Sequence, residues 1–207
     1  MLTNSSTHYG SLAKFFHWSI ALLFGFQFLS ILYFRYLEEG MTDFTWTVLN
    51  AHKTAGMLIL ILGIARLFWR LQIPLPNWPE SFDDWDKSLS HFAEYGLYTC
   101  IFLMTLSGIF IEMAGGHYVP FFGLFYVDNL SPFIHLGAVD YSEVTMAARG
   151  AGKLPFLHDC LVVVHIIGAY GVLFFFSVHI THIFRHQRQV KDQILKRMMP
   201  NSKKESP

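Results

Sequence analysis

Four long apolar stretches constrain the fold of this chain more than any other feature of its sequence. A helix needs about 20 mostly apolar residues to cross the hydrocarbon core of a bilayer. Four segments reach that length, at about residues 12–36, 47–69, 91–113 and 156–184. We therefore predict an all-α integral membrane protein, with a single four-helix bundle over residues 1–200 and a disordered tail at 201–207.

Composition agrees with a membrane protein. Apolar residues make up 53% of the chain and charged residues 14%, whereas soluble domains carry about 25% charge. The net charge of zero gives no reason to expect a nucleic-acid partner. Cys100 and Cys160 are too few for a disulfide scaffold. The first apolar stretch is too long for a cleaved signal peptide, and no small-residue cleavage site follows it.

The distribution of lysine and arginine predicts the orientation. If the N-terminus is cytoplasmic, ten of these residues lie on the cytoplasmic side and four on the outer side, while Arg66 stays within the second span. Because positive charge favours the cytoplasmic side, we expect both termini there. The outer connection at 114–155 is then about 40 residues long, and its apolar segment 119–127 is expected to lie on or dip into the outer interface.

Histidines within the spans suggest the chemistry, because ionisable residues inside a membrane are costly and usually functional. His165 and His179 are 14 residues apart, which places both on nearly the same helix face, separated by roughly 21 Å. His52 lies at the outer depth and His17 at the inner depth. This pattern suits two haems, each held by two imidazoles from facing helices.

Other readings of the histidines remain open at this point. A histidine within a span often serves only as a polar contact between helices. His158 could replace His165, but its distance from His179 would be about 31 Å, too long for the hydrocarbon core. His91 could replace His17 or hydrogen-bond a quinone, and His182 lies near the same level.

Two arginines fit the haem scheme. Arg66 follows His52 by 14 residues and returns to the same face at the inner depth, and Arg35 follows His17 by 18 residues. Arginine pairs well with carboxylates such as haem propionates. The alternative is that both are ordinary interface residues whose side chains extend to the headgroups.

The motifs around these residues resemble those of the bacterial cytochrome b561 family, which consists of small four-helix membrane proteins with two haems. The resemblance covers nearly the whole chain, and the order and spacing of its short motifs are specific. They are Phe16-His17-Trp18, Asn50-Ala51-His52-Lys53, Ala65 to Arg70, Ser90-His91-Phe92, Leu97-Tyr98, Ser107-Gly108, His165, His179, Lys191-Asp192 and Arg197 to Pro200.

The resemblance implies two haems b, one on His17 and His179 and one on His52 and His165, in a multi-pass protein of the bacterial inner membrane. It also implies electron exchange with ubiquinone. Within the family the chain looks like superoxide oxidase, an oxidoreductase that takes electrons from superoxide at the outer side. Lys53 is then the candidate donor contact, and Arg66, Trp18 and His186 are candidates for the quinone or the inner propionates.

Two features depart from the family pattern. The outer connection looks longer, and Glu94 stands where a second polar histidine is expected. The long connection supports an alternative in which the protein anchors a hydrogenase- or dehydrogenase-type complex and relays its electrons to quinone. A haem-free transporter is disfavoured, because none of the spans is interrupted by glycine and proline.

Overall fold

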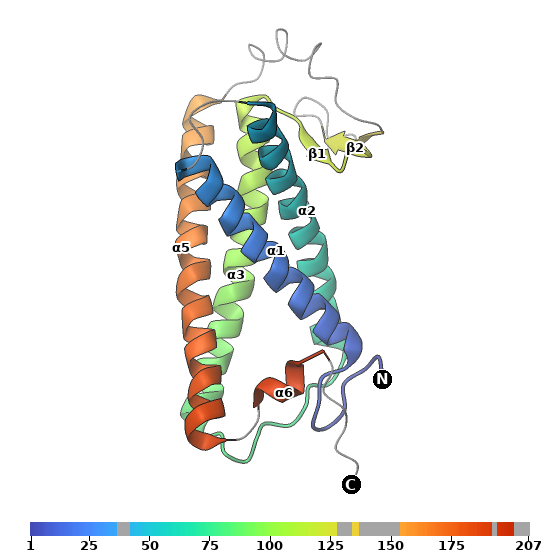
Figure 1. Cartoon of the computed structure of the whole chain (residues 1–207), viewed down its shortest axis with the longest axis vertical. Coiled ribbons are helices and arrows are strands. Elements are labelled where there is room, and N and C mark those ends of the chain that lie inside the picture. Colours follow the sequence, from blue (N-terminus) through green and yellow to red (C-terminus); the bar gives the residue numbers. More distant parts are fainter. Residues whose placement is uncertain (37–41, 128–133, 137–153, 192–193, 201–207) are drawn as a thin grey trace. The chain divides into compact units, whose positions relative to one another are not determined.

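Four long helices dominate the computed structural model, which describes residues 1–36, 42–127, 134–136, 154–191 and 194–200 (Figure 1). They are α1 (Ser11–Tyr36), α2 (Asp43–Gln72), α3 (Asp84–Gly115) and α5 (Pro155–Arg185). Each is long and apolar enough to cross a membrane, which confirms the predicted fold class. The tail predicted to be disordered lies outside the described residues, and the side of the membrane on which the termini lie stays a prediction.

The helices extend beyond the apolar stretches because polar residues cap them. α3 begins seven residues before the apolar segment, where the Asp83 carboxylate accepts a hydrogen bond of 2.8 Å from the Asp86 backbone N–H. At the start of α2, the Thr42 hydroxyl accepts from the Thr45 N–H, and the Thr45 hydroxyl accepts from the Thr42 N–H, both at 3.2 Å. Hydropathy detects only the apolar part of such helices, so the segments predicted for α2 and α3 are shorter than the observed helices.

The C-terminal part of the chain returns to the start of α1. After α5 come the π-helical turn η1 (His186–Val190), a left-handed Lys191 and the short helix α6 (Ile194–Met198). The Trp18 indole N–H donates to the Met198 carbonyl at 2.9 Å, and the Lys14 ammonium donates to the Met199 carbonyl at 2.8 Å. These two hydrogen bonds hold α6 against α1.

A small antiparallel sheet follows α3. Its strands β1 (Val119–Phe121), β2 (Phe125–Val127) and β3 (Ile134–Leu136) pair in the order β1-β2-β3. The Thr54 hydroxyl of α2 donates to the Pro120 carbonyl at 3.1 Å, and Val119 is buried. The apolar segment 119–127 is therefore a hairpin packed on α2. Its place relative to the membrane stays a prediction, and residues 128–133 and 137–153 lie outside the described part.

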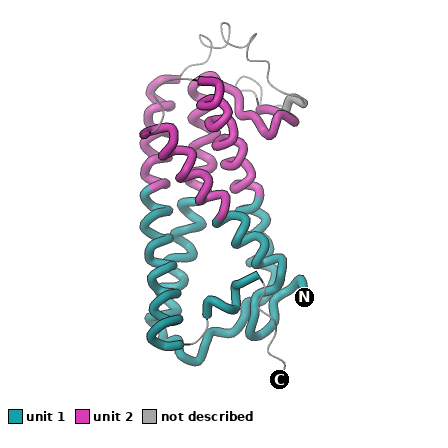
Figure 2. Tube along the Cα trace, in the orientation of Figure 1, with its two compact units in different colours: residues 1–21, 62–101, 170–207 teal, residues 22–61, 102–169 magenta. Residues whose placement is uncertain are grey.

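The chain divides into two compact units, and each long helix contributes a segment to both (Figure 2). Unit 1 comprises residues 1–21, 62–101 and 170–207, and unit 2 comprises residues 22–61 and 102–169. Large apolar side chains are exposed in both, among them Phe68 in unit 1 and Leu22 in unit 2. Such a surface is typical of a protein whose helices face lipid.

Glycines allow α3 and α5 to approach closely within each unit. In unit 1, a Cβ atom added at Gly96 would lie 2.2 Å from the Phe175 ring, and one at Gly171 would lie 2.6 Å from the Cys100 sulfur. In unit 2, a Cβ at Gly168 would lie 2.7 Å from the Met104 side chain. Small residues at helix contacts are common in membrane proteins, where packing drives helix association.

Candidate functional site

The four predicted histidines fall into two pairs, one in each unit. Unit 1 contains His17 of α1 and His179 of α5, and unit 2 contains His52 of α2 and His165 of α5. All four side chains are half-buried. Each histidine thus lies in the same unit as the partner that was predicted from its depth within the membrane spans.

The pair in unit 1 has the spacing that a shared metal atom requires. The ring centres of His17 and His179 lie 6.3 Å apart. Two imidazoles that bind one metal atom from opposite sides, each through a nitrogen about 2.0 Å away, have ring centres about 6 Å apart. The Trp18 ring packs edge-on against His17 at 5.4 Å and limits the rotation of that imidazole. The pair therefore fits axial ligation of a haem iron.

The pair in unit 2 is oriented by serine hydroxyls. His52 Nδ1 lies 2.8 Å from the Ser30 hydroxyl, and His165 Nδ1 lies 3.0 Å from the Ser107 hydroxyl. Each serine donates its only hydroxyl proton to a backbone carbonyl, Ser30 to Gln27 and Ser107 to Met104. Each hydroxyl must therefore accept from the imidazole, which assigns the proton to Nδ1 and leaves the Nε2 lone pair free to bind a metal.

His52 and His165 also lie close enough to interact electrostatically. Gly108 makes room for the second of them, because a Cβ atom added at this position would lie 3.2 Å from His165 Cε1. A larger residue would have to push the imidazole away. Gly108 and Ser107 together therefore determine where the His165 ring lies.

Arg66 lies beside the histidine pair of unit 1. It interacts electrostatically with His17 and His179. Its Nε donates to the Tyr98 hydroxyl at 3.1 Å, and its Nη1 donates to the Ala13 carbonyl at 3.4 Å. These bonds hold a positive charge next to the pair, which suits an anionic group such as a propionate.

Two buried N–H groups of unit 1 have no hydrogen-bond partner among the described residues. They belong to Trp69 Nε1 and to His91 Nδ1, the latter if it carries the proton. A buried donor without a partner is costly, and it often marks a place where a ligand or water binds. His91 also stacks on Tyr95 and packs edge-on against Trp78, so its ring is fixed. Both groups suit hydrogen bonds to a propionate or a quinone.

A second charged group of unit 1 surrounds Glu94. The Arg70 guanidinium donates to both carboxylate oxygens of Glu94, at 2.7 and 2.8 Å. Tyr9, which precedes α1, lies near this pair. Burial raises the pKa of the Tyr9 hydroxyl above its ordinary value, and the charge of Glu94 adds to the effect. Tyr9 therefore stays protonated at neutral pH, and Glu94 serves as the partner of a cation in this part of the fold.

The remaining predicted residues have different surroundings. Arg35 is exposed in the last turn of α1. The Trp18 N–H is engaged by Met198. The Lys53 ammonium pairs with Glu112 Oε2 at 2.7 Å, and both side chains are largely buried. Lys53 is therefore held within unit 2 by an ion pair.

The structure also brings together a cluster that sequence reasoning missed. Asp86 of α3 lies against His182 and His186, and all three are buried. The sequence does contain two signals for it, namely histidines four residues apart and the acidic run at 83–86. Because Asp86 and His182 are 96 positions apart in the chain, neither signal predicts that they meet.

Together, four membrane-length helices and two histidine pairs define the class of small membrane cytochromes. The family model for prokaryotic cytochrome b561 matches residues 8–201. The chain is also 25% identical over 200 residues to cytochrome b561 homolog 2 of Escherichia coli (strain K12), covering 97% of this chain and 95% of the relative. The chain therefore belongs to the prokaryotic cytochrome b561 family, whose members are multi-pass membrane proteins of haem b electron transfer.

Proposed function

We propose that this protein is a cytochrome with two haems b that passes single electrons from a donor on the outer side of the bacterial inner membrane to ubiquinone. The observation that carries the proposal is the presence of one suitably oriented histidine pair in each unit. Haem b bound at each pair would supply a one-electron carrier through the change between ferric and ferrous iron.

His17 and His179 would hold the haem of unit 1. The 6.3 Å between their ring centres supports this assignment, as does the cation Arg66 beside them. The unpartnered N–H groups of Trp69 and His91 would offer further hydrogen bonds to the propionates or to the quinone.

His52 and His165 would hold the haem of unit 2. The serine hydroxyls keep a proton on Nδ1 of each imidazole and so leave Nε2 as the ligand atom. A hydrogen bond at the far nitrogen also raises the electron-donating power of a ligating imidazole. Arg35 belongs to the same unit and would reach a propionate from the end of α1.

Lys53 is the proposed donor contact, because it follows a ligand of the outer haem. Its pairing with Glu112 holds the ammonium in place next to His52. On the cytoplasmic side, His186 would contact the quinone. Trp18 would hold the C-terminal segment in place through its hydrogen bond to the Met198 carbonyl. Both termini would face the cytoplasm, as the distribution of lysine and arginine favours.

A coupled assay on the purified holoprotein tests both halves of this function. Superoxide is generated enzymatically in the presence of a water-soluble ubiquinone analogue, and ubiquinol is quantified. We expect ubiquinol formation that depends on the protein and stops when superoxide dismutase is added. If superoxide fails to reduce the protein, the donor assignment is wrong. If the protein is reduced but no ubiquinol forms, the acceptor assignment is wrong.

A further inference from the structure

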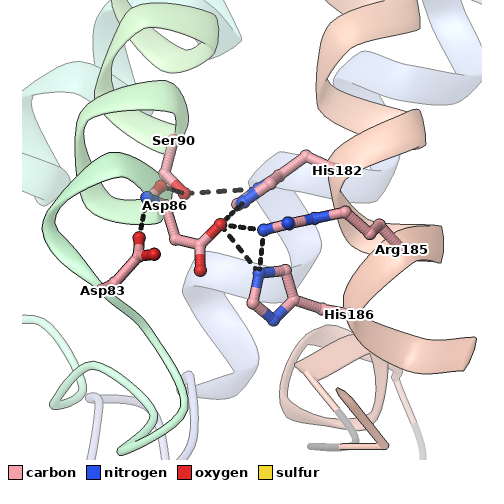
Figure 3. A network of polar contacts seen from close by, with 6 residues as sticks. All are labelled: Asp83, Asp86, Ser90, His182, Arg185 and His186. Atoms are coloured by element: carbon pink, nitrogen blue, oxygen red, sulfur yellow. Dashed lines mark hydrogen bonds and ion pairs between the residues drawn. The ribbon is translucent and has the colours of Figure 1, made fainter. Parts of the chain in front are cut away.

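Two imidazoles and a carboxylate converge at the junction of α5 and η1 in unit 1 (Figure 3). The Asp86 Oδ1 atom lies 3.2 Å from His182 Nε2 and 3.2 Å from His186 Nε2. The side chains of these residues are 0–5% exposed. The Phe82 ring covers both imidazoles, with its centre 5.6 Å from that of His182 and 4.3 Å from that of His186.

The hydrogen bonds place the Nε2 lone pair of His186 at the centre of this cluster. Arg185 Nη2 lies 3.1 Å from His186 Nε2, and because a guanidinium only donates, Nε2 must be the acceptor. The Ser90 hydroxyl donates to the Asp86 carbonyl at 2.9 Å and lies 3.5 Å from His182 Nδ1. The Asp86 carboxylate only accepts, so His182 Nε2 donates to it at 3.2 Å. A metal ion at the centre of the cluster would replace this proton and the Arg185 guanidinium.

In this structure the cation is the guanidinium of Arg185. Its Nη2 contacts both Asp86 Oδ1 and His186 Nε2. The side chain of Arg185 is 42% exposed, in contrast to the three residues that it touches. It can therefore turn out to solvent and open the centre of the cluster without disturbing the buried packing.

Two of the three distances between the ligand atoms match a tetrahedral metal site, and all three atoms lie within 4.8 Å of one another. Ligands that are about 2.0 Å from a zinc ion lie about 3.3 Å from one another, close to the 3.2 Å found here. Histidines at positions i and i+4 of one helix are a common zinc-binding pair. The Ser90 hydroxyl lies 3.5 Å from His182 Nδ1, where it would accept the Nδ1 proton once a metal ion occupies Nε2, as outer-shell partners of metal-binding histidines do.

We propose that Asp86, His182 and His186 bind a divalent transition-metal ion of the zinc class, which displaces the Arg185 guanidinium. The site is separate from the two histidine pairs assigned to haem. A bound ion would take the Nε2 lone pair of His186. The test needs no electron donor and no quinone, although His186 is also the residue proposed to contact the quinone.

The test uses the purified haem-containing protein and zinc alone. Zinc affinity is measured by competition with a fluorescent chelator, and the ligands are identified by X-ray absorption at the zinc edge. We expect one equivalent of zinc bound through two imidazole nitrogens and a carboxylate oxygen. Loss of an outer-shell partner weakens metal sites about 10–100-fold, so Asp86→Asn and His182→Ala should weaken binding at least as much.

Arg185→Ala is the variant that separates this proposal from a purely structural ion pair. Removing the competing cation should tighten zinc binding about two- to fivefold, the effect of a partly exposed ion pair. Asp159→Asn and His158→Ala alter an exposed Asp–His pair in unit 2 and serve as matched controls with unchanged affinity. Retained haem absorbance shows that each variant is folded. Absence of stoichiometric binding, equal affinity in Asp86→Asn, or weaker binding in Arg185→Ala would overturn the proposal.

Discussion

His17 and His179 face each other in unit 1 with their ring centres 6.3 Å apart. If the two imidazoles share one haem, losing either removes the same cofactor. We therefore expect His17→Ala and His179→Ala each to lower the haem content from two to one per chain. The double variant should also retain one haem. The content is measured from the pyridine haemochrome spectrum and the protein concentration.

The complementary combination tests the pairing itself. His17→Ala combined with His165→Ala removes one residue from each pair, and this variant should bind no haem. If it retained one haem while the His17→Ala and His179→Ala double variant lost both, the histidines would be paired in the wrong way. His8 precedes α1, so the control variant His8→Ala should retain both haems.

Ser107 controls the electronic state of His165 through the Nδ1 proton. Ser107→Ala removes the hydroxyl that accepts that proton, leaves the Met104 carbonyl as its partner and makes the imidazole a weaker electron donor, which favours ferrous iron. We expect the midpoint potential of one haem to rise and that of the other to stay the same, with both haems bound. Redox titration followed in the visible spectrum measures the two potentials.

Ser177→Ala is the matched control, because Ser177 lies on α5, the helix of His165, but is exposed and donates to the Leu173 carbonyl. Its potentials should equal those of the wild type. A rise of both potentials in Ser107→Ala would mean that the serine does not act through one imidazole.

Gly108 tests the position of the His165 ring. Valine at this position brings a side chain against His165 Cε1, which is already 3.2 Å from where a Cβ would lie. We expect Gly108→Val to lower the occupancy of the unit 2 haem and to leave the unit 1 haem bound. Gly25→Val is the control, since nothing lies within 4 Å of a Cβ at that position. Equal haem loss in the two variants would show that the effect is not local.

Variants of the Lys53–Glu112 ion pair separate the contribution of Lys53 to stability from its proposed contact with the electron donor. Lys53→Met leaves a largely buried carboxylate without its partner, which should lower the free energy of unfolding by about 1–3 kcal/mol. The double variant with Glu112→Leu should recover most of that loss. Lys87→Met breaks an exposed pair with Asp84 and should change stability by less than about 1 kcal/mol. Thermal unfolding in detergent measures all three.

The same variants report on the electron donor. If Lys53 contacts superoxide, its loss slows reduction by superoxide even in the stabilised double variant. Full activity of the double variant would restrict Lys53 to a structural role.

The sequence predicted the helices well because four apolar stretches of membrane length leave few alternatives. It predicted the ends of α1 and α5 to within one residue but not those of α2 and α3. Asp83 extends α3 and Thr42 begins α2 through side-chain caps, which hydropathy does not record. The sequence also did not predict that residues 119–127 form a hairpin, because they are almost continuously apolar and show no clear alternation of apolar and polar residues.

The candidate haem ligands could be predicted from helical spacing, because residues on one continuous helix have a fixed separation. Their orientation was not, because it depends on hydrogen bonds between different helices, such as the one from His52 to Ser30. The Asp86 cluster was missed for the same reason. Only the packing of α3 against the end of α5 brings its three ligand atoms together.

The haem content of the purified wild-type protein is the sharpest test of the assignment of one haem to each histidine pair. A reduced-minus-oxidised visible spectrum, calibrated by pyridine haemochrome and quantitative amino-acid analysis, gives the number and type of haems per chain. We expect two low-spin b haems per chain. One haem would contradict the assignment of one of the two histidine pairs, and no haem would contradict the whole ligand scheme.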